Sequence, residues 1–169
     1  FSLSTERSPM SIFDERVHLK PYEYSHLLEF KTAIRQSYWV HDEFNFEGDV
    51  QDFRVNCTDA ERSVITKTML AIAQVEVAVK TFWADIYSRL PVPEVGAVGM
   101  TFAEREVRHL DAYSHLLELL GLSDRFERIE EIPALRDRVQ YLNGALERVE
   151  SRDDRDFAQA ILLFSIFIE

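Results

Sequence analysis

Residues Phe102–Tyr113, with the sequence FAEREVRHLDAY, decide how the rest of the chain is arranged. If this stretch is helical, spacings of three and four place Glu106, His109 and Tyr113 on one otherwise apolar face. The opposite face is expected to be solvated, and it carries Glu104, Arg108, Asp111, His115 and Glu118. An ionised carboxylate in an apolar interior costs several kcal/mol unless a charged partner meets it. Glu106 and His109 form a Glu-x-x-His pair that could bind a metal ion, although such pairs also occur on solvated helices.

A second helix with the same anomaly is predicted from Asp59 to Arg89, with Thr58 and Glu61 as a capping box at its start. One carboxylate, Glu76, interrupts its apolar row. The row consists of Ile65, Met69, Ile72, Glu76, Val79, Trp83 and Ile86. Two such helices side by side would bring Glu76 and Glu106 to one point, whereas the alternative is a surface pair of Glu76 with Lys80.

The remaining segments predict an all-α protein with an extended arm over residues 1–20 and one helical domain over residues 21–169. Helices are expected at Pro21–Trp39, at Thr101–Leu120 with Gly121 as its stop, once or twice in 123–150 around Pro133, and at Asp153–Glu169. A loop is expected over 42–54, and a break with a short turn or helix over 91–99. The last helix is apolar nearly all round beyond Ala158, which predicts that it is buried.

Composition excludes several classes of function. The net charge of −11 disfavours nucleic acid and anionic membranes as partners. A single cysteine, Cys57, rules out an internal disulfide and a cysteine-rich zinc site, and it fits a cytoplasmic location. The longest apolar run, residues 157–168, is about half of a membrane span.

Three predicted helices each offer an inward-facing acid: Glu76, Glu106 with His109, and Glu169. Helical bundles that bind two oxygen-reactive metals use one Glu from each of two helices and a Glu-x-x-His from each of two others. Three of these four contributions are present, and a second Glu-x-x-His is not. The last helix stops at Glu169 without a cap, so we expect a fragment or a processed piece whose core and site are completed by a further segment.

Four stretches in order along the chain resemble the small, radical-generating subunit of class I ribonucleotide reductases. They are YWVHDE at residues 38–43, AQVEVAVKTFW at 73–83, EVRHLDAYSH at 106–115 and LFSIFIE at 163–169. The resemblance implies a ferritin-like helical bundle with metal ligation by Glu76, Glu106, His109 and Glu169. It also implies a radical on Tyr113, long-range electron transfer through Trp39, and a surface acid near that route at Glu43.

The same resemblance implies an enzyme that uses dioxygen and two metal ions, iron most readily and manganese or a mixed pair otherwise, because the ligands are carboxylates and imidazole. Its partners would be a large catalytic subunit and a second copy in a homodimer. This sequence departs from the family pattern in two ways. Glu76 stands where the family often has Asp. The sequence also lacks three family features: the second Glu-x-x-His helix, the Asp that links His109 to Trp39, and the tail that docks on the large subunit. A stand-alone ferritin-like oxidase or oxygenase and a non-catalytic helical interaction fragment are the alternatives.

Overall fold

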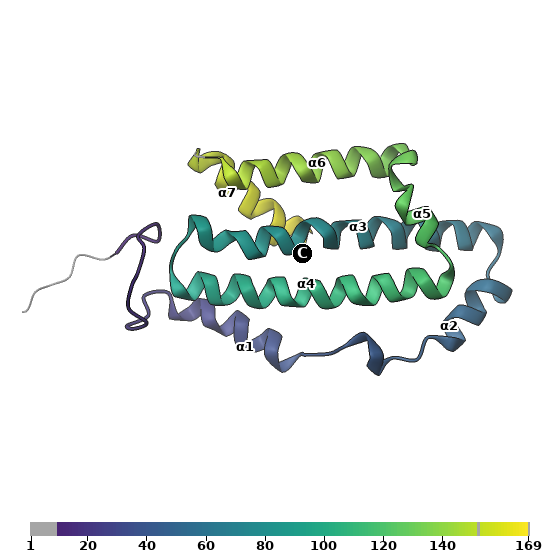
Figure 1. Ribbon diagram of the computed structural model, residues 1–169, viewed down its shortest axis with the longest axis horizontal. Coiled ribbons are helices and arrows are strands. Elements are labelled where there is room, and N and C mark those ends of the chain that lie inside the picture. Colours follow the sequence, from purple (N-terminus) through teal and green to yellow (C-terminus); the bar gives the residue numbers. More distant parts are fainter. Residues whose placement is uncertain (1–9, 152, 169) are drawn as a thin grey trace, which may run out of the picture.

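Two long helices form the centre of the molecule. The computed structural model describes residues 10–151 and 153–168, and helices are the only regular secondary structure within them. Helix α3 (Asp59–Arg89) and helix α4 (Pro93–Leu120) run antiparallel and lie side by side (Figure 1). The predicted all-α class is confirmed.

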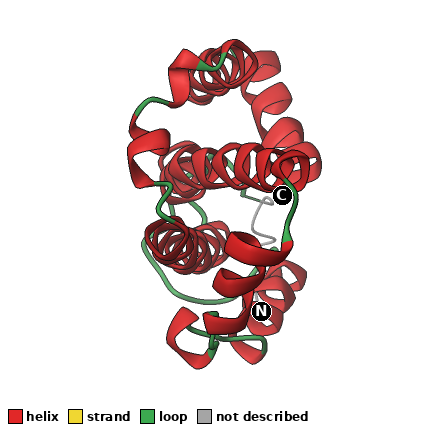
Figure 2. Cartoon of the chain, turned by 90° about the vertical axis from the view of Figure 1, so that its right-hand side faces the viewer, coloured by secondary structure: helices red, strands yellow, loops and turns green. Residues whose placement is uncertain are grey.

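Outer helices cover both sides of this central pair. Helix α6 (Pro133–Glu150) packs against α3, α7 (Asp154–Leu162) packs against α6, and α1 (Leu28–Gln36) lies along α4. The view in Figure 2 looks nearly along the long helices and shows them between the outer helices. Short helical segments complete the chain: η1 (Ser25–Leu27), η2 (His41–Glu43), α2 (Glu47–Gln51), η3 (Asp52–Asn56), α5 (Ser123–Glu127), η4 (Ile129–Glu131) and η5 (Leu163–Ile168).

The ends of the two central helices follow their sequence signals. Thr58 and Glu61 form the predicted capping box at the start of α3, and α3 has the predicted bounds. Pro93 occupies the first turn of α4, where its missing N–H costs nothing, so α4 begins there and not at Thr101. Gly121 adopts a left-handed φ of 70° and ends α4, as predicted.

Two predictions about the N-terminal half are wrong. The first helix was expected at Pro21–Trp39, but α1 covers only Leu28–Gln36. At its end, the hydroxyl of Ser37 donates to the carbonyls of Ala33 and Ile34, which competes with continuation of the helix. The region 42–54, expected to be loop, contains α2 and parts of η2 and η3.

The core consists of two apolar clusters that meet along α3 and α4. The first joins α3, the start of α4, α6 and α7, and includes Phe82, Trp83 and Phe164. The second joins α3, α4 and the segment after Gly121, and includes Leu70 and Leu117. On α3 the boundary between the clusters falls between Ala73 and Val75, next to residue 76, and on α4 residue 106 lies between Ala103 of the first cluster and Tyr113 of the second. We call this boundary the seam.

A close helix approach holds the first cluster together. A Cβ atom at Gly99 of α4 would lie 2.6 Å from the carbonyl oxygen of Trp83 on α3. Because no side chain fits in that space, glycine at position 99 is what allows the two central helices to approach each other near the seam.

Burial differs from the expected pattern in two places. Ile65 and Ile72 of the predicted row are exposed, whereas Thr66, Leu70 and Ala73 are buried, because α3 is covered on more than one flank and the buried surface is broader than one row. The C-terminal segment is not buried all round. Phe157, Ala160 and Phe164 are buried on its inner side, while Phe167 is 78% exposed.

An ion pair fastens the segment before α1 to the start of α4. Arg16 donates to Glu94 Oε2 at 2.6 Å, and both side chains are buried. The other oxygen of Glu94 accepts the backbone N–H groups of Glu23 and Tyr24 at 2.8 and 3.2 Å. Burial alone would raise the pKa of Glu94, but these hydrogen bonds and the Arg16 charge hold that pKa below its usual value. The sequence analysis did not identify this pair.

Glu94→Gln should lower the free energy of unfolding by roughly 3–5 kcal/mol, because it leaves Arg16 buried without its counter-charge. Urea titration measures the loss. Since the pKa of Glu94 is lowered in the folded state, the stabilisation by its ionised form is present above the ordinary pKa of 4.5 and is lost as the pH falls through the lower pKa of the folded state. Glu118→Gln, at an exposed position of the same helix, is the control and should change little. Equal stabilities of the two variants at pH 7 would contradict this account.

Candidate metal centre

The two carboxylates predicted to meet do meet. Glu76 on α3 is 8% exposed and Glu106 on α4 is 2% exposed, and both lie at the seam. Each sits where apolar residues on both sides of it in sequence hold the helix against its neighbour. The interior therefore holds two acids whose charges repel at short range, and that arrangement requires a compensating positive charge.

His109 supplies one such charge in the absence of metal. Its Nδ1 lies 2.8 Å from Glu106 Oε2 and 3.6 Å from Glu76 Oε2. Hydrogen bonding to Glu106, followed by the interaction with the nearby carboxylate of Glu76, raises the pKa of His109 to about 9 against the opposing effect of burial. Without metal, the imidazolium is thus the cation between two carboxylates. The alternative pairing of Glu76 with Lys80 is not needed to explain the buried charge.

The donor set fits a metal ion. One ligand atom from each of Glu76, Glu106 and His109 lies within 4.8 Å of the others. One carboxylate oxygen, Glu106 Oε1, is buried, and no residue among those that the structure describes forms a hydrogen bond with it. A single imidazolium cannot satisfy two carboxylates, and an orphaned buried oxygen is costly, so a multivalent cation would satisfy the set better. Carboxylate and imidazole donors without thiolates favour iron or manganese over zinc.

Tyr113 lies one turn beyond His109 and borders the same space. A cavity of about 440 Å³ is lined by Tyr113, Glu76, His109 and the aromatic side chains Trp39, Phe44 and Phe46. Burial, and then the charge of Glu76, raise the pKa of Tyr113 above its usual value. The phenol therefore stays protonated at neutral pH.

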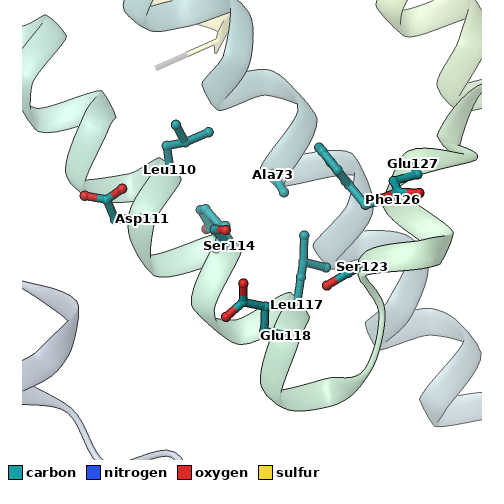
Figure 3. Close-up of a pocket in the computed structure, with 10 residues that line it drawn as sticks. Ala73, Leu110, Asp111, Ser114, Leu117, Glu118, Ser123, Phe126 and Glu127 are labelled. Atoms are coloured by element: carbon teal, nitrogen blue, oxygen red, sulfur yellow. The ribbon is translucent and has the colours of Figure 1, made fainter.

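Tyr113 also borders a second cavity, of about 380 Å³, between α3, α4 and α5. Figure 3 shows this cavity, with Ser114 and Leu117 of α4 facing Phe126 of α5 and Ala73 of α3. Within the described part of the chain, the Tyr113 side chain is only partly buried, because cavities adjoin it on two sides.

Trp39 reaches the site from the connection after α1. Its ring stacks on His109 with a centroid distance of 5.6 Å and an interplanar angle of 18°. Phe44 packs against the indole in an edge-to-face arrangement, with the ring centroids 6.1 Å apart. Trp39 is thus in direct contact with a candidate ligand, although more than sixty residues separate the two in sequence. Glu43 lies exposed in η2, close in sequence to this contact.

Two residues that were predicted to be solvated surround the site. Arg108 was expected on the solvated face of α4, yet it is 6% exposed because residues 38 and 39 fold over it. His115, expected on the same face, contacts His41 with a centroid distance of 5.2 Å. The Glu104-to-Arg108 spacing of four was a signal for an ion pair, but not for its burial. Glu169, the fourth predicted ligand, lies outside the described residues.

The sequence of this chain matches a known protein family. The family model described as ribonucleotide reductase, small chain, matches residues 16–169. A probable ribonucleoside-diphosphate reductase small subunit of Invertebrate iridescent virus 6 is 28% identical over 95% of this chain and 48% of its own length. Its counterpart in Invertebrate iridescent virus 3 is 24% identical over 79% of this chain and 36% of its own length.

Solved structures share the fold. The ribonucleotide reductase R2 subunit from Clostridium botulinum superposes with a TM-score of 0.76 at 19% identity, covering 83% of this chain and 45% of that one. A structure from Bacillus halodurans gives a TM-score of 0.77 at 17% identity, covering 86% and 53%. These matches show the ferritin-like bundle. The chain spans about half of the length of the proteins it matches, or less.

In the metal-free protein, His109 should make stability depend on pH. Its pKa is raised to about 9, so the stabilisation is fully present below the ordinary histidine pKa of 6.5 and is lost as the pH rises through about 9. Urea titrations between pH 6 and 10 in the presence of a chelator measure this loss. In His109→Gln the loss over that interval should disappear. An equally steep loss in both proteins would show that another group is responsible.

Proposed function

The chain belongs to the ribonucleotide reductase small-chain family, and on that premise we propose that it acts in the small subunit of a ribonucleoside-diphosphate reductase. That subunit generates a tyrosyl radical with dioxygen and a dimetal site, and passes the oxidising equivalent to a large subunit that converts ribonucleotides to deoxyribonucleotides. The observation that carries the proposal is the meeting of Glu76, Glu106 and His109 at the seam, with one carboxylate oxygen left unpaired.

The proposed ligands are Glu76, Glu106, His109 and, outside the described residues, Glu169. Two ions need more donor atoms than the three described ligands supply, so the proposal requires further ligands beyond these. Iron is the metal we propose, with manganese or a mixed pair as alternatives. When bound, the metals supply the capacity to activate dioxygen and to withdraw an electron from a neighbouring group.

Tyr113 is the proposed radical residue. The phenol stays protonated before oxidation, since burial and the negative charge of Glu76 both raise its pKa. Its oxidation removes one electron and one proton and leaves a neutral phenoxyl radical. Phe46 and Leu116 line the cavity beside the ring and cover it with apolar surface on that side.

Trp39 is the proposed exit for the oxidising equivalent. Its ring lies against His109 on one side, and its chain segment reaches the surface on the other, where Tyr38 is exposed. Stacked aromatic contact gives a short through-space step between the site and the outside of the bundle.

The proposed partners are a large catalytic subunit and a second copy of this chain, and a further segment, in the same chain or in a separate one, would complete the site. Within residues 10–151 and 153–168, every helix is too short or too polar to cross a bilayer. A cytoplasmic location stays a prediction from the sequence.

One observation favours a second function, that of a stand-alone dimetal oxidase. The cavity beside Glu76 and His109, at about 440 Å³, falls within the range of small-molecule sites. An oxidase would use that space for its own substrate and would not need a stable tyrosyl radical.

Tyr113→Phe tests the proposed radical. The variant should fold and bind metal like the unchanged protein, because it removes one hydroxyl from a packed ring, yet the tyrosyl signal in electron paramagnetic resonance should be abolished. Tyr141→Phe, at an exposed position of α6, is the matched control and should retain the signal. A tyrosyl signal that survives in Tyr113→Phe would place the radical elsewhere, and metal binding without any radical in the unchanged protein would favour the oxidase.

Trp39→Phe should separate radical formation from radical transfer. The Tyr113 signal should still form after loading with metal and oxygen, while nucleotide reduction with the large subunit should fail. Phenylalanine keeps the stacking surface on His109 but is far harder to oxidise than an indole. Normal turnover in this variant would remove Trp39 from the route.

A further inference from the structure

Arg108 is a buried charge that the metal ligands do not explain. Its Nε donates to both carboxylate oxygens of Glu104, at 3.1 and 3.2 Å. Its Nη1 donates to the backbone carbonyl oxygen of Trp39 at 3.2 Å. A buried guanidinium needs such partners to offset its desolvation, and here one of them is the backbone of a residue 69 positions away.

The same guanidinium lies against two aromatic rings. Its central carbon is 4.5 Å from the ring centroid of Tyr38 and 5.6 Å from that of Trp39. His109, the next residue on α4, stacks on the same indole. Two adjacent residues of α4 therefore hold Trp39. His109 stacks on the indole ring, and Arg108 contacts both the backbone carbonyl of Trp39 and its ring.

Trp39 is not part of a helix, so contacts with other segments must fix its position. Helix α1 ends at Gln36 and η2 begins at His41, so Trp39 lies in the connection between them. A side chain in a connection keeps rotamer freedom that packing or hydrogen bonds must remove. A planar guanidinium that bonds a carboxylate on one side and a carbonyl on another removes this freedom better than a lysine ammonium does.

We propose that Arg108 is a positioning residue that holds the indole of Trp39 against His109. The effect of Arg108 on turnover rests on the proposed function of Trp39. The positioning of the indole by Arg108 does not depend on that function. Glu104 orients the guanidinium, and Arg108 fixes the backbone and ring of Trp39. The opposing view is that Arg108 only lines the groove of about 470 Å³ between α1 and α4.

The indole N–H resonances of the metal-free protein test the positioning directly. The chain has two tryptophans, so Trp83 in the core serves as an internal reference. In Arg108→Met the Trp39 resonance should shift or broaden while that of Trp83 stays in place. Arg108→Lys should give a smaller change, and Arg138→Met, at an exposed position of α6, should change neither. An unmoved Trp39 resonance in Arg108→Met would overturn the proposal.

Loss of the Trp83 resonance would reveal that Arg108→Met does not fold. In that case Arg108→Lys serves as the test, and an unmoved Trp39 resonance in that variant would overturn the proposal. With metal and the large subunit, Arg108→Met should keep the amount of Tyr113 radical but lose about tenfold or more in turnover, since small misplacements of reacting groups carry large rate penalties. Full turnover with a displaced indole would overturn the catalytic part. If the protein without substitutions were inactive with the large subunit, the proposed function would be refuted. The indole N–H resonances would still show whether Arg108 positions Trp39.

Discussion

Two carboxylates buried face to face between α3 and α4 are the constraint on which the structure depends. Glu76 and Glu106 repel each other in an interior that solvates neither, and His109 provides one positive charge for both. The arrangement is unfavourable for stability alone, because apolar residues at these positions would join the two flanking clusters into one core. Such a seam suits the binding of a cation, and the buried oxygen Glu106 Oε1, which no described residue bonds, agrees with that role.

The rest of the bundle serves to hold this seam. Gly99 lets the central helices approach, the two apolar clusters fix them on either side, and the pair of Arg16 with Glu94 fastens the preceding segment to the start of α4. That segment leads into α1 and then to Trp39, so the order of the chain brings an indole to the candidate ligand. The aromatic contact is built from a connection, and for this reason it needs Arg108 as well as His109.

The sequence predicted what periodicity and capping determine. Helix α3, the stop at Gly121 and the inward position of Glu76 and Glu106 follow from spacing, caps and the interruption of apolar rows. Contacts made by connections were not predictable in this way. Arg108 looked solvated because its own helix offers no cover, and the cover comes from residues 38 and 39, distant in sequence. Glu94 was missed for the same reason, since its partner Arg16 lies in a segment without period.

Anomalous diffraction tests the central claim most directly, namely that α3 and α4 together hold a metal ion. Crystals of the protein loaded with iron or manganese should give an anomalous peak at the absorption edge of that metal within coordination distance of Glu76, Glu106 and His109 Nδ1. The His109 imidazole should then bind the metal and no longer bond to the carboxylates of Glu76 and Glu106, which bind the metal themselves. A fully loaded crystal with no peak at the seam, and with Nδ1 of His109 still bonded to Glu106, would show that the buried acids form a closed ion-pair cluster and not a metal centre.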